Sequence, residues 1–391
     1  MEKLYCSRVW FASFMAVFAV IFHVQGAIVI DHNCRSLDIP EELIDSAKAK
    51  LHIAYNHTSH GSQLITGMNA LRNHAAFGNR FDWDDAGNRA GALDLDDVGI
   101  TDSVPDLSQG DRLDANGMTP WFNQTKAFLE NPANSHVNVI MWSWCSINGH
   151  DAQRYLDNMD SLVVLFPDVK FVYMTGHAGG TGESMAVNGI HYNNELIRNH
   201  CREHDRILFD FADIEAYNPD NVYFWDKYMR DNLNYLDPSS GQARNWASEW
   251  LEGNPDNTLA TLTESCYSCA HSDSPTDARL NCVLKGIASW WLFCKLAEGE
   301  PTSPVKFKKL RSQTKDYKLQ IVKSSKICIE NISKQNMEIK VSDIQGRNVA
   351  KITSSSESVN FSTRDLAPGL YVVQVYSRGA LAGKHIVPIN R

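Results

Sequence analysis

The chain lacks a second long apolar run, because after Val24 no segment is apolar enough to span a membrane. A bilayer span needs about 20 consecutive apolar residues. Basic side chains are also scarce in residues 1–300, where 21 Lys and Arg face 40 Asp and Glu. An acidic surface of this kind repels phosphates. We therefore expect no transmembrane segment in the mature protein and no nucleic-acid partner.

The one long apolar stretch stands at the N-terminus. A weakly basic start is followed by apolar residues 9–24 and then by Val24-Gln25-Gly26, directly before Ala27. This order is typical of a cleavable secretory signal peptide, and the run is short for a membrane anchor. We predict that residues 1–26 are removed on export and that the mature protein is secreted or attached to the cell surface.

The charge changes sign along the chain. Residues 301–391 carry 16 basic and 6 acidic side chains, which gives this part a net charge of +10 although the whole chain carries -9. A swing of this size indicates two units of different origin. We expect a body over residues 27–299, a polar linker over 300–316 and a separate C-terminal domain over 317–391.

The body alternates short apolar runs with segments of helical spacing. Apolar runs that are buried in such an alternation form a mainly parallel sheet with helices on both faces. The sequence therefore predicts an α/β fold, a doubly wound three-layer sandwich of the flavodoxin-like type. The expected strands are 51–55, 137–142, 169–174 and 206–211, and the expected helices are 40–50, 63–76, 151–166, 183–204 and 280–296. Residues 77–109 read as a long loop with at most one short strand near 93–95.

The C-terminal part shows short alternating strands between residues 319 and 389, which predicts a small antiparallel β-sandwich. Three motifs stand out in it, namely VSDIQGR at 341–347, DLAPGLYVV at 365–373 and KHIV at 384–387. In order and spacing they resemble the C-terminal sorting domain of type IX secretion in Bacteroidota. The resemblance implies contact with the secretion machinery, transport across the outer membrane, and surface attachment or release.

Eight cysteines remain after the signal, and four of them cluster between Cys266 and Cys294. Export favours disulfides within this cluster, although spacing alone does not fix the pairing. Cys266-x-x-Cys269, with His271 and Cys282, would otherwise suit zinc.

Four polar loops, rich in histidine, are predicted where strands end or just before the last helix. They cover residues 56–64, 142–150, 175–182 and 266–273. In an open α/β sheet, ligands bind at the carboxyl ends of the strands. We therefore expect the site where these loops meet.

Ser62 is the candidate nucleophile, because Gly61 permits a sharp turn and a helix begins at once. A plain helix N-cap is the alternative role for this serine. His271, just before the last predicted helix, is the candidate base. This order resembles the SGNH (GDSL-like) hydrolases, with His60-Gly61-Ser62 at the position of their Gly-Asp-Ser motif.

The sequence departs from that family at its acid, because Ser268 stands three residues before the histidine, and Asp273 is the nearest substitute. The resemblance implies a serine esterase that removes acyl groups, such as acetyl, from a carbohydrate, without a cofactor or metal. Loop tryptophans suit stacking on sugar rings. The residues expected at the oxyanion and substrate are His60, Gly61, Ser143, Asn148, His177 and Trp142.

Two other functions stay open on the same residues. His57, His60 and His177 would serve a metal-dependent hydrolase, since imidazoles bind zinc and related metals. A non-catalytic surface protein that binds glycans through its loop tryptophans is the third hypothesis.

Overall fold

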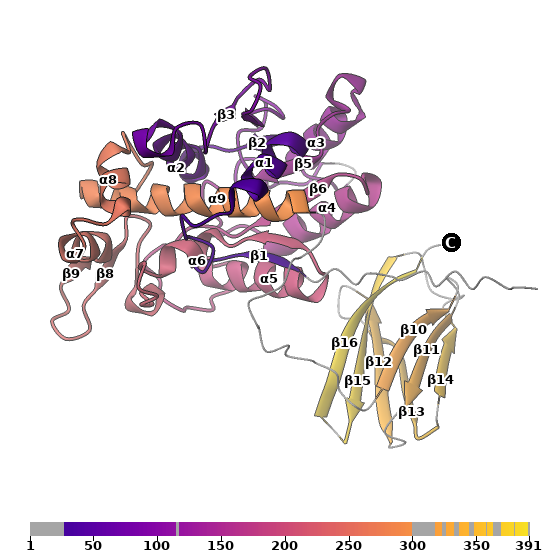
Figure 1. Cartoon of the computed structure of the whole chain (residues 1–391). Helices are drawn as coiled ribbons and strands as arrows, with labels where there is room; N and C mark the ends of the chain where they lie inside the picture. Colours follow the sequence, from indigo (N-terminus) through magenta and orange to yellow (C-terminus); the bar gives the residue numbers. More distant parts are fainter. Residues whose placement is uncertain are drawn as a thin grey trace, which may run out of the picture. The chain divides into compact units, whose positions relative to one another are not determined.

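The computed structural model forms two compact units, Met1–Thr302 and Ser303–Arg391 (Figure 1). The predicted signal peptide and the linker 300–316 lie outside the residues that the structure describes. Those residues are 27–114, 117–298, 317–322, 326–331, 336–343, 348–356, 358–362, 369–378 and 380–389.

The first unit is built on a seven-stranded sheet in which all neighbours pair in parallel. The strand order is β1-β7-β6-β5-β2-β4-β3. The strands are β1 (Ile28–Ile30), β2 (His52–Asn56), β3 (Trp83–Asp84), β4 (Leu93–Asp97), β5 (Val139–Trp142), β6 (Lys170–Met174) and β7 (Ile207–Phe209). The predicted α/β fold with a parallel sheet is thus confirmed.

Burial of both strand faces explains why short apolar runs became strands. All four residues of β5 are buried, as are four of the five residues of β2 and of β6. Successive side chains of a strand point to opposite faces, so such strands are covered on both sides.

Two groups of helices provide the cover. In one group, α9 packs against α1, α2, α6 and α8, and in the other α4 packs against α3 and α5 (Figure 1). The helices are α1 (Glu41–Lys50), α2 (Ser62–Asn73), α3 (Pro120–Glu130), α4 (Ala152–Leu165), α5 (Ile190–Glu203), α6 (Phe211–Ala216), α7 (Trp246–Gly253), α8 (Thr258–Ser265) and α9 (Leu280–Glu298).

Helices α2 and α9 approach each other through two facing glycines. A Cβ atom on Gly67 would lie 1.8 Å from the carbonyl oxygen of Cys282, and one on Gly286 would lie 2.3 Å from the carbonyl carbon of Gly67. Any larger residue would force the two backbones apart. The glycines therefore bring the polar residues of these helices within reach of one another.

The chain reverses its direction across the sheet at β2. After β2 it adds the edge strand β3 and then β4, between β3 and β2, on one side; it then crosses to β5 on the other side and continues to β6 and β7. The crevice beyond the carboxyl ends of β2 and β5 is the topological switch point, which is where such sheets bind ligands.

The predicted elements differ from the structure mainly at their ends. The segment predicted as one helix over 183–204 is helical only from Ile190, because turns around Asn188 and Gly189 precede it. The insert over 77–109 contains β3 as well as β4. A two-stranded antiparallel sheet, β8 (Asn234–Leu236) and β9 (Ala243–Asn245), was not predicted.

The second unit contains a three-stranded sheet, β10-β11-β14, and a four-stranded sheet, β13-β12-β15-β16, both antiparallel. The strands are β10 (Tyr317–Val322), β11 (Lys326–Asn331), β12 (Met337–Asp343), β13 (Asn348–Ser354), β14 (Ser358–Ser362), β15 (Gly369–Ser377) and β16 (Ala380–Ile389). Its buried apolar residues are Ile329, Met337, Ile339, Val341, Val359, Val373 and Val375. The small antiparallel C-terminal domain was thus predicted correctly.

No helix within the described parts of the chain has the length and apolar character needed to cross a bilayer.

Candidate functional site

The loops after β2, β5 and β6 meet at the switch point. His60 lies in a single 3₁₀ turn, Ser59–Gly61, which follows β2. Its ring Nδ1 lies 2.6 Å from the carbonyl oxygen of Cys145, in the loop after β5. His177, after β6, stacks on the same ring. His60, from the loop after β2, therefore contacts both the loop after β5 and the loop after β6.

Gly61 permits this approach because no side chain fits at its position. A Cβ atom there would lie 2.0 Å from Oγ of Ser143 and 2.5 Å from Cβ of His57. The hydroxyl of Tyr55 donates to the carbonyl of Gly61 at 2.9 Å and fixes the turn. Ser143 is buried, and its hydroxyl has no hydrogen-bond partner in the described part of the chain.

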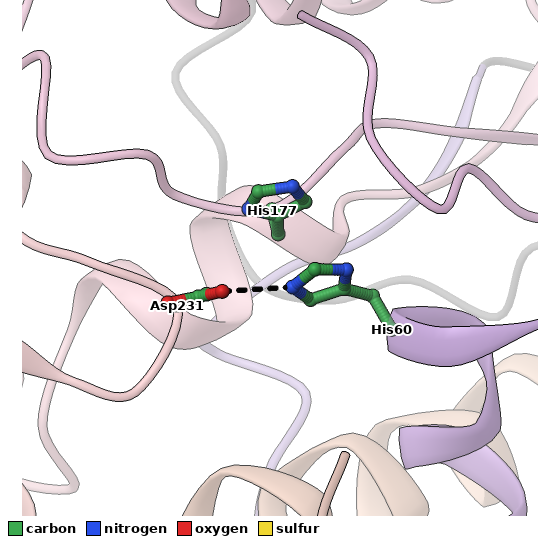
Figure 2. Close-up of side chains that lie close together, drawn as sticks. All are labelled: His60, His177 and Asp231. Carbon is green, nitrogen blue, oxygen red and sulfur yellow. Dashed lines mark hydrogen bonds and ion pairs between the residues drawn. The ribbon is translucent and has the colours of Figure 1, made fainter. Parts of the chain in front are cut away.

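Three imidazole rings form a parallel stack with His60 in the middle. The His60 ring centroid lies 3.7 Å from that of His177 and 3.9 Å from that of His271, with interplanar angles of 6° and 9°. Figure 2 shows the His60 and His177 rings above one another, with Asp231 at one end of the His60 ring. His60 is only 4% exposed, whereas the His271 side chain is 44% exposed. The stack therefore runs from the protein interior to solvent.

Asp231 reaches the stack from a segment between helices that is tied to the loop after β6. The Gly180 N–H donates to the carbonyl of Met229 at 2.8 Å, and Gly179 and Arg230 form an isolated antiparallel bridge. These contacts fix the segment beside His177.

The Asp231 carboxylate lies close to two of the stacked rings, those of His60 and His271. Its Oδ2 lies 3.0 Å from Nε2 of His60 and 4.0 Å from Nδ1 of His271. Burial alone would raise the pKa of Asp231, but the hydrogen bond from His60 and the neighbouring imidazoles outweigh it and lower that pKa. The carboxylate is therefore charged at neutral pH.

Both ring nitrogens of His60 face acceptors. Nδ1 faces the carbonyl oxygen of Cys145 and Nε2 faces the carboxylate of Asp231. A neutral imidazole has a proton on only one nitrogen, so the other would meet its acceptor with a lone pair. Burial lowers the pKa of His60, which opposes a second proton. Both acceptors have a partner if His60 is an imidazolium, or if a cation lies between Nε2 of His60 and the carboxylate of Asp231.

Ser59 and His271 form the contact that most resembles a nucleophile with its base. The Ser59 hydroxyl is hydrogen-bonded to Nε2 of His271. Both residues have positive φ, 53° and 62°, a conformation that is uncommon outside glycine. Backbone strain of this kind clusters at active sites.

Ser62, the serine that the sequence favours, occupies the first position of α2. Its hydroxyl donates to the carbonyl of Ser59 at 2.7 Å. The serine hydroxyl found at His271 is instead that of Ser59, three residues earlier. A nucleophilic role for Ser62 remains a prediction.

Asp273, the substitute acid expected from sequence, pairs with Arg279 and has a side chain that is 46% exposed. The carboxylate recorded beside His271 is that of Asp231. The role of Asp273 remains a prediction too.

The other residues expected at the site are spread around it. Trp142 is fully buried and its indole N–H donates to Oγ1 of Thr125 at 2.9 Å, so its ring packs in the core. Asn148 is exposed. His57 directs Nε2 to Oδ1 of Asp97 at 2.5 Å, apart from the stack.

A disulfide joins Cys269 to Cys282, with Cα atoms 5.8 Å apart. It ties the segment that carries His271 to the first turn of α9. The prediction of a disulfide in this cysteine cluster is confirmed, and the bridge removes two of the thiols that a zinc site at Cys266-x-x-Cys269 would need. Cys266 is a buried free thiol.

Sequence reasoning missed Asp231 and gave Ser59 no separate role. Asp231 stands in an irregular segment without a motif, and long-range contacts such as the bridge between Arg230 and Gly179 bring it to the site. Ser59 lies inside a loop that the sequence did single out, but its positive φ leaves no signature in the residue type.

Comparisons with known proteins place the C-terminal part. Residues 323–389 match the secretion system C-terminal sorting domain. No curated protein matches the chain. Among solved structures, domains d3–d4 of the rat CD45 extracellular region match with 15% identity and a TM-score of 0.15, over 18% of this chain and 44% of that chain. So low a score carries no argument about fold or function.

The match to the sorting domain agrees with the motifs and the antiparallel strands of residues 317–389. A type IX sorting domain is the part of a cargo protein that the secretion machinery handles. The protein is therefore a secreted or cell-surface protein that carries a type IX secretion C-terminal sorting domain.

Proposed function

We propose that the α/β unit is a serine carboxylic-ester hydrolase that works outside the cell. One observation carries the proposal, namely the hydrogen bond between the Ser59 hydroxyl and Nε2 of His271, two residues that both have positive φ. Asp231 lies on the Nδ1 side of the same imidazole. A hydroxyl, an imidazole and a carboxylate in this sequence of contacts are the parts of a catalytic triad.

In this mechanism the Ser59 oxygen bonds to the ester carbonyl carbon while its proton passes to Nε2 of His271. The tetrahedral intermediate then collapses, its C–O bond to the alcohol breaks, and the alcohol leaves with that proton. Water then attacks the carbonyl carbon of the acyl-serine and gives a proton to His271. The C–O bond to Ser59 breaks, the acid leaves, and His271 passes that proton to the Ser59 oxygen. Asp231 orients the ring and stabilises the imidazolium. Ser143 and Asn148 are the proposed donors to the oxyanion.

The resemblance to SGNH hydrolases supports the same reaction class. In that family the nucleophile follows the first strand of the sheet core and the histidine precedes the last helix. Ser59 follows β2, and His271 precedes α9. The serine departs from the family because Ser62, not Ser59, stands at the position of the family's serine. The acid departs from it too, because Asp231 comes from a separate segment rather than from a position just before the histidine.

An acylated carbohydrate is the proposed substrate. Trp142 and Trp144 are buried, so they leave no ring face for a sugar. Tyr228 and Tyr267 are 54% and 66% exposed and stand within four residues of Asp231 and of His271. Exposed aromatic rings suit stacking on a sugar ring.

Labelling with a fluorophosphonate tests the proposal on the full chain, with the modified residue located by fragment-ion mass spectrometry. We expect the label on Ser59, and we expect none after Ser59→Ala or His271→Ala. Ser62→Ala is the matched control, because this serine lies one turn away and should leave labelling unchanged. Label on Ser62 instead would move the nucleophile to that residue. A folded protein that takes no label would contradict the serine mechanism and favour glycan binding without catalysis.

A metal-assisted hydrolase is the second candidate, and its supporting observation is the cluster of His60, His177 and Asp231. Their possible ligand atoms all lie within 4.8 Å of one another. Two imidazoles and a carboxylate are a known ligand set for catalytic zinc. His57 does not belong to this cluster because Asp97 holds its ring. The lone pairs of the stacked His60 and His177 rings lie in two parallel planes, so one ring would have to rotate about its Cβ–Cγ bond before one ion could lie in the plane of both rings.

Dialysis against a chelator separates the two candidates. Serine catalysis predicts unchanged hydrolysis and labelling afterwards. Loss of hydrolysis that zinc restores, together with hydrolysis that persists in the Ser59→Ala variant, would favour the metal.

A further inference from the structure

A buried ion pair lies behind the histidine stack. Lys285 of α9 and Glu215 of α6 are both 0% exposed, and Nζ lies 2.6 Å from Oε2. Burial lowers the pKa of Lys285 to about 8, although Glu215 opposes this. A buried pair of charges stabilises a fold no better than well-packed apolar residues do. The presence of such a pair between two buried helices therefore calls for another explanation.

One carboxylate oxygen of Glu215 holds the loop after β6. It accepts the backbone N–H of Ala178, the residue next to His177. His177 in turn directs its Nδ1 to the carbonyl of Ala178 at 2.6 Å. The backbone on which His177 rests is thus fixed by Glu215.

Lys285 reaches the loop of His271 through Gln63. Its Nζ donates to Oε1 of Gln63 at 2.5 Å, and Nε2 of Gln63 donates to the carbonyl of Ala270 at 2.5 Å. Gln63 is fully buried in the first turn of α2, three residues after His60. The close approach of α2 and α9 at their facing glycines makes this contact possible.

Asn281, one helical turn before Lys285, completes the connections. Its Nδ2 lies 3.3 Å from Oε2 of Glu215, 2.9 Å from Oγ of Ser272 and 3.2 Å from the carbonyl of Asp231. The hydroxyl of Ser272 also donates to the carbonyl of Asp231. The backbone of Asp231 and that of the residue after His271 are therefore held together.

We propose that Lys285 and Glu215 are positioning residues, which set the mutual placement of His177, Asp231 and His271 through this network. The proposal rests on the proposed function for what that placement serves. Glu215 binds the backbone beside His177 directly and reaches Asp231 through Asn281. Lys285 reaches the loop of His271 through Gln63. A misplacement of about 1 Å in such a constellation can cost about 100-fold in rate.

Removing one charge alone would leave the other buried without a partner, so the test uses paired substitutions on the full chain. Glu215→Gln with Lys285→Met keeps an acceptor for the Ala178 N–H, whereas Glu215→Leu with Lys285→Met removes it. Hydrolysis of p-nitrophenyl acetate should fall about 10-fold in kcat in the first pair and about 100-fold in the second, with KM changed less than twofold. A higher kcat with glutamine than with leucine at position 215 would show that the acceptor for the Ala178 N–H matters, as a positioning role requires.

Ser289→Ala is the matched control. Ser289 is buried on α9 one turn after Lys285, and its hydroxyl donates only to the backbone carbonyl of that residue. We expect this variant to keep wild-type kcat.

Long-range ¹H–¹⁵N spectra of the histidines give a readout that does not need activity. The Glu215→Leu, Lys285→Met pair should shift the signals of His177 and His271, while Gln63→Met should shift those of His271 and spare His177. Gln63→Met also keeps the test decisive if the paired variants do not fold.

Two results would overturn positioning by this pair. The first is a folded Glu215→Leu, Lys285→Met variant with wild-type kcat and unchanged histidine signals. The second is Gln63→Met with no effect on His271. If the wild-type protein shows neither labelling nor hydrolysis but the signals move as expected, the proposed function fails and the positioning network stands.

Discussion

The interiors of the two units differ in kind. The core of the α/β unit contains charged groups that are fully out of solvent, above all Lys285 and Glu215. The described core of the C-terminal unit consists of aliphatic side chains and Met337. Buried charge weakens a core unless it is fully paired, so a core that serves folding alone does without it. The unit that holds buried charges is the one with a polar cluster at its sheet edge.

Among the substitutions that test the difference between the two cores, Lys285→Met alone should have the largest effect. Glu215 would then be a buried carboxylate without its cation, and we expect the free energy of unfolding of the α/β unit to fall by about 3–5 kcal/mol. Tryptophan fluorescence during urea unfolding measures it, because residues 301–391 contain no tryptophan. A change under 1 kcal/mol would mean that the pair is not the dominant buried charge.

A smaller effect is expected from opening the disulfide in the Cys269→Ser, Cys282→Ser variant. The bridge closes a loop of 13 residues in sequence separation. Opening a bridge that closes a loop of this length lowers the free energy of unfolding by about 3 kcal/mol. The same fluorescence assay applies, with Cys201→Ser as a control for loss of a buried thiol. Equal midpoints for the two variants would contradict the expectation.

The smallest effect concerns the C-terminal unit. Ile339→Val removes one methylene from a side chain that is 1% exposed, and we expect a loss of about 1 kcal/mol. The change should appear in the unfolding followed by far-ultraviolet circular dichroism and leave the tryptophan transition unchanged. A shift of both transitions would show that the two units unfold together and that their cores are not independent.

The sheet and its loops could be predicted because their causes are local. Apolar runs such as Val139–Trp142 can be buried on both faces only in a parallel sheet, and the carboxyl ends of such strands meet at one edge. That rule was enough to bring His60 and His177 to one place. The disulfide followed from export and from clustered cysteines.

Asp231 and Ser59 could not be predicted as the partners of His271, because tertiary contacts bring these residues together. Asp231 is at the site because its neighbour Arg230 pairs with Gly179, a contact between irregular segments. Ser59 faces His271 because its backbone is left-handed. The alternative role of Ser62 as a helix N-cap is wrong, because Gly61 is the N-cap of α2 and no side chain caps this helix. Lys285 did carry a signal, since a lysine in the middle of an apolar helix needs a partner.

The bridge between Cys269 and Cys282 also sets a time at which the site can be completed. Ala270, His271 and Ser272 all lie inside the loop that it closes. Thiols stay reduced in the cytoplasm and pair in the compartments beyond it. The newly made chain therefore carries His271 on an open loop, and that loop is closed only after the protein has left the compartment in which it was synthesised.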